Sequence, residues 1–415
     1  MVYQVKALDN YMAIKTVLIL TDAFPPAFAP RMGYLSKYLG EHDWKGIAIS
    51  PIYDNCRKDF AFLSDVIPTR RIYFSEQIKK RNIIHKAVSF FFPDMRVEWG
   101  LNKEMRLHID NLISKEQIDI ILCSTCILFP LNIAYKVAKK YKIPWVADLR
   151  DISEQYPVKE SFLMELQKKI GILRRNNILR RANAITVVSE KHVEILNDYT
   201  LKAYCIYNGA DTDIFLPSNK CYNLNKFNIV YTGTLNFRAG RDISPLFSAI
   251  KQMYLNNDIT FKDCCIRFYT DIASQEIINK AKKIFSVSDF VECIDFVPAT
   301  EIPKILNESS ILLLLLDRKN NGIMTTKFFE YLAVGRPILC IWSDEGTVEE
   351  IINNSRAGIA AKSEADISLF IKSKYDEWLK NGYTTSDIDK EHVKNFTRKH
   401  NAKQFVELFD SVLRS

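Results

Sequence analysis

Residues 322–340 read Gly-Ile-Met-Thr-Thr-Lys-Phe-Phe-Glu-Tyr-Leu-Ala-Val-Gly-Arg-Pro-Ile-Leu-Cys, and this stretch decides the fold. The apolar run Ile311–Leu316 precedes it and has the length of a strand that is buried on both faces. Thr325 and Thr326 are N-cap candidates for a helix, and Gly335 can end that helix. A second apolar run follows. The order strand, loop, helix, strand is the unit of a parallel sheet, so the sequence predicts an α/β fold.

Two charged residues lie in the first turns of this predicted helix. Lys327 would place a cation beside the positive end of the helix dipole, which is unfavourable unless an anion lies between them. The free amides of a helix N-terminus suit a phosphate. Glu330 lies one turn further on and could accept hydrogen bonds from ribose hydroxyls. The alternative interpretation is an ordinary amphipathic helix with a lysine and a glutamate on its surface.

The segment 326–339, Thr-Lys-Phe-Phe-Glu-Tyr-Leu-Ala-Val-Gly-Arg-Pro-Ile-Leu, resembles the nucleotide-sugar-binding segment of family 4 glycosyltransferases. These are retaining enzymes of the GT-B fold. The resemblance implies that Glu330 binds the donor ribose. The family has another glutamate seven residues earlier, where this sequence has Gly322. The contact of that glutamate with the sugar would then be left to the amides of residues 320–325.

A second segment of the C-terminal half also resembles the family. A strand predicted from residue 228 ends at Gly233, and glycine lets a ligand approach the backbone. The family has a basic residue in the following loop that holds the donor diphosphate together with the equivalent of Lys327. Arg238 or Arg241 would match it, and we favour Arg241. By the same resemblance, the backbone near Phe296 would receive the base. The alternative for the loop is a glycine turn with arginines on the surface.

The N-terminal half carries candidate acceptor-side residues at the ends of two predicted strands. Arg31 follows a proline-rich loop, and we consider it either an anion contact or a surface arginine. The segment with Asp148, Arg150, Asp151 and, further on, Glu154 follows a buried strand and resembles the Asp-x-Arg-Asp of the family. The resemblance implies acceptor positioning or acid–base work for these residues. A buried Arg–Asp pair that braces the loop is the alternative.

Composition bounds the class of protein. The 415 residues suggest two domains, and 47% hydrophobic with 26% charged residues is typical of globular proteins. The net charge of +8 is too small to indicate nucleic-acid binding by itself. Nine scattered cysteines without a metal-binding pattern suit a reducing cytoplasm. No apolar run reaches the ~20 residues that span a bilayer.

The predicted architecture is two doubly wound, Rossmann-like domains that face each other across a cleft. Residues 14–211 would form the acceptor-side domain and residues 226–390 the nucleotide-sugar domain, with residues 391–415 as a helix that packs back on the N-terminal domain. The segment 208–217, Asn-Gly-Ala-Asp-Thr-Asp-Ile-Phe-Leu-Pro, resembles the end of the family's N-terminal domain.

The resemblance implies transfer of a sugar from a nucleotide diphosphate donor, with a uridine nucleotide as the expected base and retention at the anomeric carbon. The expected acceptor is a glycan or a polyprenyl-diphosphate-linked glycan in surface polysaccharide or glycoconjugate synthesis. We expect no metal or other cofactor, because the cations of the site would take a metal's place. The basic helix predicted at 161–181 suggests attachment of a cytoplasmic protein to the anionic inner face of a membrane. A nucleotide-sugar epimerase and a non-catalytic partner protein are the alternatives.

Overall fold

The computed structural model describes residues 14–52, 61–67, 69–75, 101–126, 128–155, 161–218, 225–235, 240–316 and 324–415. Two predicted site residues, Arg238 and Gly322, lie outside these ranges. The described chain divides into two compact units. The first holds the residues up to Arg150 together with Val158–Thr186 and Ala402–Ser415. The second holds Asp151–Pro157 and Val187–Asn401.

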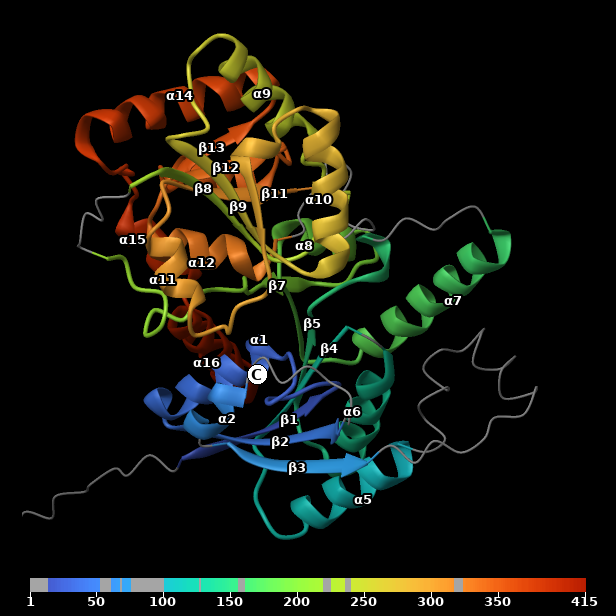
Figure 1. The fold of residues 1–415 in the computed structure, drawn as a ribbon. Helices are drawn as coiled ribbons and strands as arrows, with labels where there is room; N and C mark the ends of the chain where they lie inside the picture. Colours follow the sequence, from blue (N-terminus) through green and yellow to red (C-terminus); the bar gives the residue numbers. More distant parts are fainter. Residues whose placement is uncertain are drawn as a thin grey trace, which may run out of the picture. The chain divides into compact units, whose positions relative to one another are not determined.

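The N-terminal half builds a seven-stranded sheet of order β3-β2-β1-β4-β5-β6-β7 (Figure 1). The pairs β1–β2, β1–β4, β2–β3 and β4–β5 of this sheet are parallel. The central strands are mostly apolar and are buried along almost their whole length, as expected for a sheet that is covered on both faces. The strands are β1 (Lys15–Thr21), β2 (Trp44–Ile52), β3 (Arg70–Ser75), β4 (Ile120–Thr125), β5 (Trp145–Leu149), β6 (Ala184–Val187) and β7 (Ala203–Cys205).

The helices between these strands pack on the sheet through their apolar residues, for example Met105 and Ile109 of α5 and Ile133 and Val137 of α6. They are α1 (Pro30–Tyr38), α2 (Ala61–Val66), α5 (Leu101–Ile113), α6 (Leu128–Tyr141), α7 (Phe162–Leu179) and α8 (Glu190–Asn197), with short 3₁₀ turns at Leu39–His42 and Ser153–Gln155.

The helix predicted at 161–181 is present as α7, and several of its apolar residues face solvent. Phe162 is 79% exposed and Leu173 is 64% exposed. Only the second half of α7 is anchored, through Ile172 and Leu179, and one of its basic residues, Arg175, is buried there. The apolar residues near the start of α7 therefore do not pack in the core.

The second unit builds a six-stranded parallel sheet of order β10-β9-β8-β11-β12-β13. Its strands are β8 (Phe227–Thr232), β9 (Cys264–Tyr269), β10 (Val291–Ile294), β11 (Ile311–Leu315), β12 (Ile338–Ile341) and β13 (Gly358–Ala361). Its helices are α9 (Ser244–Leu255), α10 (Ile272–Ile284), α11 (Ile302–Asn307), α12 (Thr326–Val334), α13 (Thr347–Asn354), α14 (Glu364–Asn381) and α15 (Lys390–Val393), with 3₁₀ turns at Ser288–Phe290 and Lys394–Phe396.

Strand β11 shows how this sheet is buried on both faces. Ile311, Leu313 and Leu315 pack in one apolar cluster with α9, α10 and α14. Leu312 and Leu314 point the other way, into a second cluster with α12 and α13. The predicted two-sided burial of this strand and the doubly wound fold are confirmed. Helix α12 ends at Gly335, whose φ of 72° is in the left-handed region, as predicted.

The two units differ from the sequence-based domains in three segments, namely 151–157, 187–211 and 391–401, all of which fall in the second unit. The longest of these is 187–211, which the sequence-based domains place at the end of the N-terminal domain. The reason is packing, because Ala210 and Phe215 lie in the same apolar cluster as Phe329 of α12 and Phe396.

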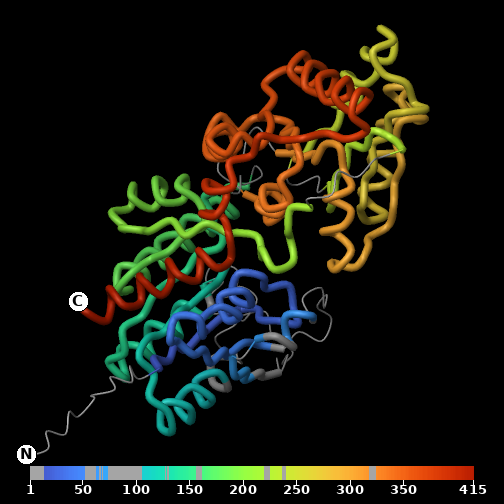
Figure 2. The backbone as a smooth tube through the Cα atoms, turned by 90° about the vertical axis from the view of Figure 1, so that its left-hand side faces the viewer, coloured from blue at the N-terminus to red at the C-terminus, as the bar shows by residue number. Residues whose placement is uncertain are grey.

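The last helix, α16 (Arg398–Arg414), belongs from Ala402 onward to the first unit (Figure 2). Its Phe409 ring lies 5.3 Å from the ring of Trp44, and its Asp410 accepts a 2.6 Å bond from Lys15.

Candidate functional site

The site in the second unit begins where β8 ends, at Gly233. The side chain of Lys327, from the first turn of α12, lies directly over this glycine. A Cβ atom at position 233 would be 2.1 Å from both Cε and Nζ of Lys327. The φ of Gly233 is +122°, which side-chain-bearing residues rarely adopt. Gly233 therefore provides the space that the Lys327 ammonium occupies at the carboxyl edge of the sheet.

Lys327 is a cation whose charge the site does not neutralise. Burial, and after it the nearby Arg241 charge, lower the pKa of Lys327 to about 8, against the opposing attraction of Glu330. The ammonium lies 5.6 Å from the centre of the Tyr231 ring, which stabilises it only weakly. An anion at this point would remove much of the unfavourable energy of the charge.

Arg241 supplies the second cation, and β8 and the turn after it hold this residue in place. Its Nη1 donates to the backbone oxygen of Thr234 at 2.7 Å. The hydroxyl of Tyr231 donates to the same oxygen at 2.9 Å. Arg241 thus lies close enough to Lys327 to affect its pKa, and its predicted role in holding a donor diphosphate stays a prediction.

The N-terminus of α12 adds donors. Thr325 is the N-cap residue, with extended backbone, but its side chain makes no capping hydrogen bond. Its buried Oγ1 has no hydrogen-bond partner within the described part of the chain. Thr326 is the first helical residue, so its amide and that of Lys327 are among those that a helix cannot satisfy internally. These donors and the two cations suit a phosphate-bearing ligand.

Glu330 follows one turn along α12, near the charges of two cations. Burial raises the pKa of Glu330 to about 6, and Lys327 and Arg398 oppose this rise. Arg398, which is only 2% exposed, donates from Nη1 to Oδ1 of Asn208 at 3.3 Å. The sequence did not single out Arg398. The signal that was available is its place at the start of the last amphipathic helix.

Phe296 lies in the loop that follows β10, on the same edge of the sheet. Its side chain is 42% exposed, which leaves part of the ring accessible to a ligand. The expectation that a base binds near Phe296 stays a prediction.

The predicted acceptor-side residues Arg31 and Asp148 form a buried pair in the first unit. Asp148 is fully buried and accepts from Arg31 Nη2 at 2.8 Å and Nε at 2.9 Å. Ser124 and Thr186 donate to the same carboxylate at 2.7 Å each. Burial alone would raise the pKa of Asp148, but the Arg31 charge and these bonds together lower it. The geometry favours the bracing alternative over contact with a substrate, and Arg31 is not the surface arginine that we considered.

The remaining candidates follow β5. Arg150 forms an ion pair with Asp22, and both side chains are mostly buried. Asp151 accepts from Gln155 Nε2 at 2.8 Å, and Glu154 lies with Gln155 in a short 3₁₀ turn. The structure thus gives Arg150 a partner at the end of β1 and leaves Glu154 half-buried. The roles predicted for these residues in acceptor binding stay predictions.

No group of three metal-ligating side chains occurs among the described residues, and none of the described helices is long and apolar enough to span a bilayer.

Comparison with known proteins was made for the sequence and for the fold. Residues 65–214 match the family model described as Glycosyltransferase Family 4. This part of the chain is therefore similar to Glycosyltransferase Family 4. The predicted resemblance to the family is thereby confirmed from a part of the chain other than the α12 motif that first suggested it. No curated protein sequence matches the chain.

Solved structures extend the likeness to the whole GT-B fold. Sucrose-phosphate synthase from Thermosynechococcus elongatus is 12% identical with a TM-score of 0.66, over 96% of this chain and 99% of that one. HepE from Anabaena, in complex with UDP and glucose, is 14% identical with a TM-score of 0.65, over 96% and 100%. A glycosyltransferase from Rickettsia africae is 15% identical with a TM-score of 0.64, over 98% and 100%. The predicted GT-B fold is confirmed. A UDP-N-acetylglucosamine 2-epimerase scores lower, with a TM-score of 0.52 at 12% identity, over 96% and 95%.

Proposed function

We propose that this family 4 protein transfers a sugar from a UDP-sugar to a glycan or a polyprenyl-diphosphate-linked glycan, with retention of anomeric configuration, in surface polysaccharide or glycoconjugate synthesis. The observation that carries the proposal is the Lys327 ammonium, seated over Gly233 beside Arg241 and the N-terminus of α12. The complexes of Anabaena HepE with UDP and UDP-glucose support uridine as the base.

The chemistry of this site is stabilisation of the departing diphosphate. As the bond to the sugar breaks, negative charge grows on the β-phosphate of the leaving UDP. Lys327, Arg241 and the first amides of α12 are fixed before the reaction, so they can stabilise this charge without reorganising. In this mechanism the side-chain cations act where other transferases use a metal ion, and no cofactor is required. Glu330 would accept hydrogen bonds from the ribose hydroxyls.

Titration calorimetry with UDP, GDP and their glucose conjugates tests the donor site. We expect saturable binding of one nucleotide to the wild type and weaker binding to Lys327→Ala. If no nucleotide binds, the donor-site argument fails and the non-catalytic partner interpretation takes its place. If UDP-N-acetylglucosamine binds and is converted to its epimer, the reaction is that of an epimerase. Release of UDP that depends on an added acceptor supports transfer.

We also propose that the protein attaches peripherally to an anionic membrane surface through α7. Phe162, Leu163 and Met164 at the start of this helix are each at least 50% exposed. Lys168 and Lys169 follow on the next turns. Exposed apolar residues next to cations are typical of interfacial helices. Flotation with phosphatidylglycerol vesicles should recover the wild type and lose Phe162→Ser/Leu163→Ser, and equal recovery of both proteins would refute the attachment site.

A further inference from the structure

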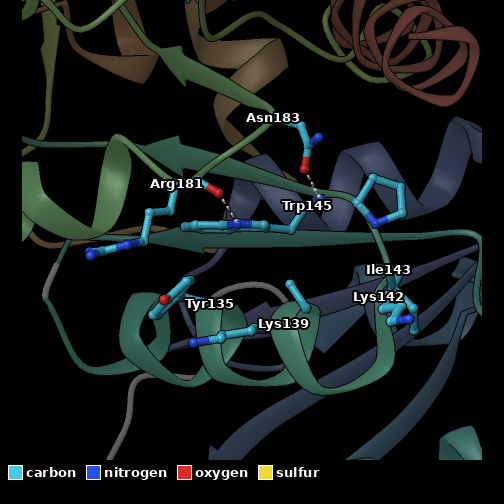
Figure 3. A pocket seen from close by; sticks show the side chains of 9 residues that line it. Tyr135, Lys139, Lys142, Ile143, Trp145, Arg181 and Asn183 are labelled. Carbon is cyan, nitrogen blue, oxygen red and sulfur yellow. Dashed lines mark hydrogen bonds between the residues drawn. The ribbon is translucent and has the colours of Figure 1, made fainter.

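A pocket in the first unit lies at the amino ends of the strands, away from the carboxyl edge that holds Asp148. Its volume is ≈ 340 Å³, which is at the small end of the range for sites that bind small molecules. Figure 3 shows it between α6 and the turn that joins α7 to β6. The residues that line it are Tyr135, Ala138, Lys139, Lys142, Ile143, Pro144, Trp145, Arg181 and Asn183.

Three of the residues that line the pocket are cations, and no acidic residue is among those that line it. Figure 3 shows Arg181 and Lys139 extending toward the same end of the Trp145 indole, with Lys142 at the other end. The side chains of Lys139, Lys142 and Arg181 are exposed to solvent. Lys140, which follows Lys139 in α6, differs from these three residues. It does not line the pocket, and it forms an ion pair with Asp110 at 3.0 Å. The pocket thus concentrates positive charge that its own lining does not neutralise.

The groups around these cations are held rigidly. The Arg181 guanidinium lies 5.2 Å from the centre of the Tyr135 ring and donates from Nη1 to the backbone oxygen of Asn177 at 2.8 Å. The backbone oxygen of Arg181 accepts from the Trp145 indole at 2.8 Å. Asn183 accepts from the backbone amide of Trp145 at 3.0 Å, which orients its amide group. Arginine held in this way keeps further N–H groups for a planar or tetrahedral anion.

We propose that this pocket binds a phosphate group, with the phosphate at the end formed by Lys139 and Arg181. The ligand is a phosphorylated small molecule or the headgroup of an anionic lipid, since both present the same phosphate chemistry. A carboxylate ligand fits less well, because three cations exceed what a single negative charge requires. The proposal concerns the opposite edge of the first sheet and does not depend on the function proposed for the second unit.

The test is calorimetric titration with inorganic pyrophosphate in the presence of saturating UDP, so that the donor site is not available. The same titration in Lys327→Met covers the case in which UDP does not bind. We expect Lys139→Gln/Arg181→Gln to bind pyrophosphate at least about tenfold more weakly than the wild type, because each variant residue removes a charge-assisted hydrogen bond. Lys140→Gln is the matched control, since it removes the same charge one residue away, and it should bind like the wild type.

Lys139→Gln/Lys142→Gln provides a second variant that leaves the Arg181 contacts in place. Circular dichroism and melting temperature check that each variant is folded. Equal affinity of both double variants and the wild type would overturn the proposal, and so would an equal loss in Lys140→Gln. Flotation with phosphatidylglycerol vesicles distinguishes the sources. Recovery that pyrophosphate abolishes in the wild type assigns a lipid headgroup, and pyrophosphate binding without such recovery assigns a soluble phosphate ester.

Discussion

Replacing Lys327 by methionine should stabilise the protein without ligand and weaken its binding of UDP-glucose. The surroundings of Lys327 in the structure explain both the expected gain in stability and the expected loss of affinity. The ammonium is buried near Arg241, so its charge is unfavourable in the folded protein, and the pKa of Lys327 falls from 10.5 to about 8. Methionine keeps the length and the apolar stem of the side chain but carries no charge. If the Lys327 charge stabilised the fold instead, its replacement by methionine would lower the stability of the protein.

The magnitude follows from the shift in pKa. A fall of about 2.5 pKa units corresponds to roughly 3 kcal/mol of unfavourable charging in the folded state. Residual contact with solvent reduces this, so we expect a gain of about 1–3 kcal/mol in the free energy of unfolding, or several degrees in Tm. Because the folded pKa lies below the unfolded one, the unfavourable term is fully present below pH 8. It disappears as the pH rises from about 8 to 10.5.

The assay is scanning calorimetry of wild type and variant at pH 7 and pH 9.5, with Lys280→Met on the exposed surface of α10 as control. The Tm difference for Lys327→Met should be large at pH 7 and shrink at pH 9.5. The loss of one charge-assisted contact should raise the Kd for UDP-glucose by about 10- to 150-fold. A lower Tm at pH 7, or an unchanged Kd, would refute the reasoning.

Three further predictions follow from the same contacts. Gly233→Ala should weaken UDP-glucose binding about as much as Lys327→Met, because the new Cβ displaces the Lys327 ammonium. Calorimetry of the double variant should then show no further loss of affinity, and additive losses would contradict this. Affinity for UDP-glucose should be greatest between pH 6 and pH 8, falling at lower pH as Glu330 is protonated and at higher pH as Lys327 is neutralised. UDP-glucose is the suitable ligand because its diphosphate does not titrate in this range, and an affinity that is constant from pH 5 to pH 9 would oppose both assignments. Asp148→Asn should lower the free energy of unfolding by about 3–5 kcal/mol in urea titrations, because it leaves the buried Arg31 charge without its carboxylate partner. The double variant Asp148→Asn/Arg31→Met should recover part of that loss. A loss of activity at unchanged stability would instead favour a catalytic role for Asp148.

The sequence predicted those parts of the fold that local patterns determine. Ile311–Leu316 was recognised as a strand because every residue is apolar, and Gly335 as a helix end because only glycine adopts that backbone conformation easily. The same reasoning predicted the helix α7 but not which of its residues are buried. A helical period shows which residues share a face, but it does not show whether another element covers that face. Phe162 and Leu173 are exposed for this reason.

The candidate site was predictable to a similar degree. Lys327 and Glu330 were found because a motif fixes their place at one helix N-terminus. Arg398 was missed because its effect on Glu330 depends on contacts between segments that are distant in sequence, which no local pattern records. The interpretation of Asp148 stayed open for the same reason, since its partners come from α1, β4 and β6.

The state of each charge distinguishes the residues that build the fold from those that await a ligand. Asp148 and Arg31 satisfy each other with short bonds inside the first unit, so a substrate would gain little by approaching either of them. Lys327 and Glu330 differ from this pair. Burial lowers the pKa of Lys327 and raises that of Glu330, so it favours the neutral form of each, and neither charge is fully compensated. Buried charges with shifted pKa values cluster at functional sites, where a bound ligand can remove the unfavourable energy. In the function proposed here, a nucleotide diphosphate would do this for both, with its phosphates at the lysine and its ribose hydroxyls at the glutamate.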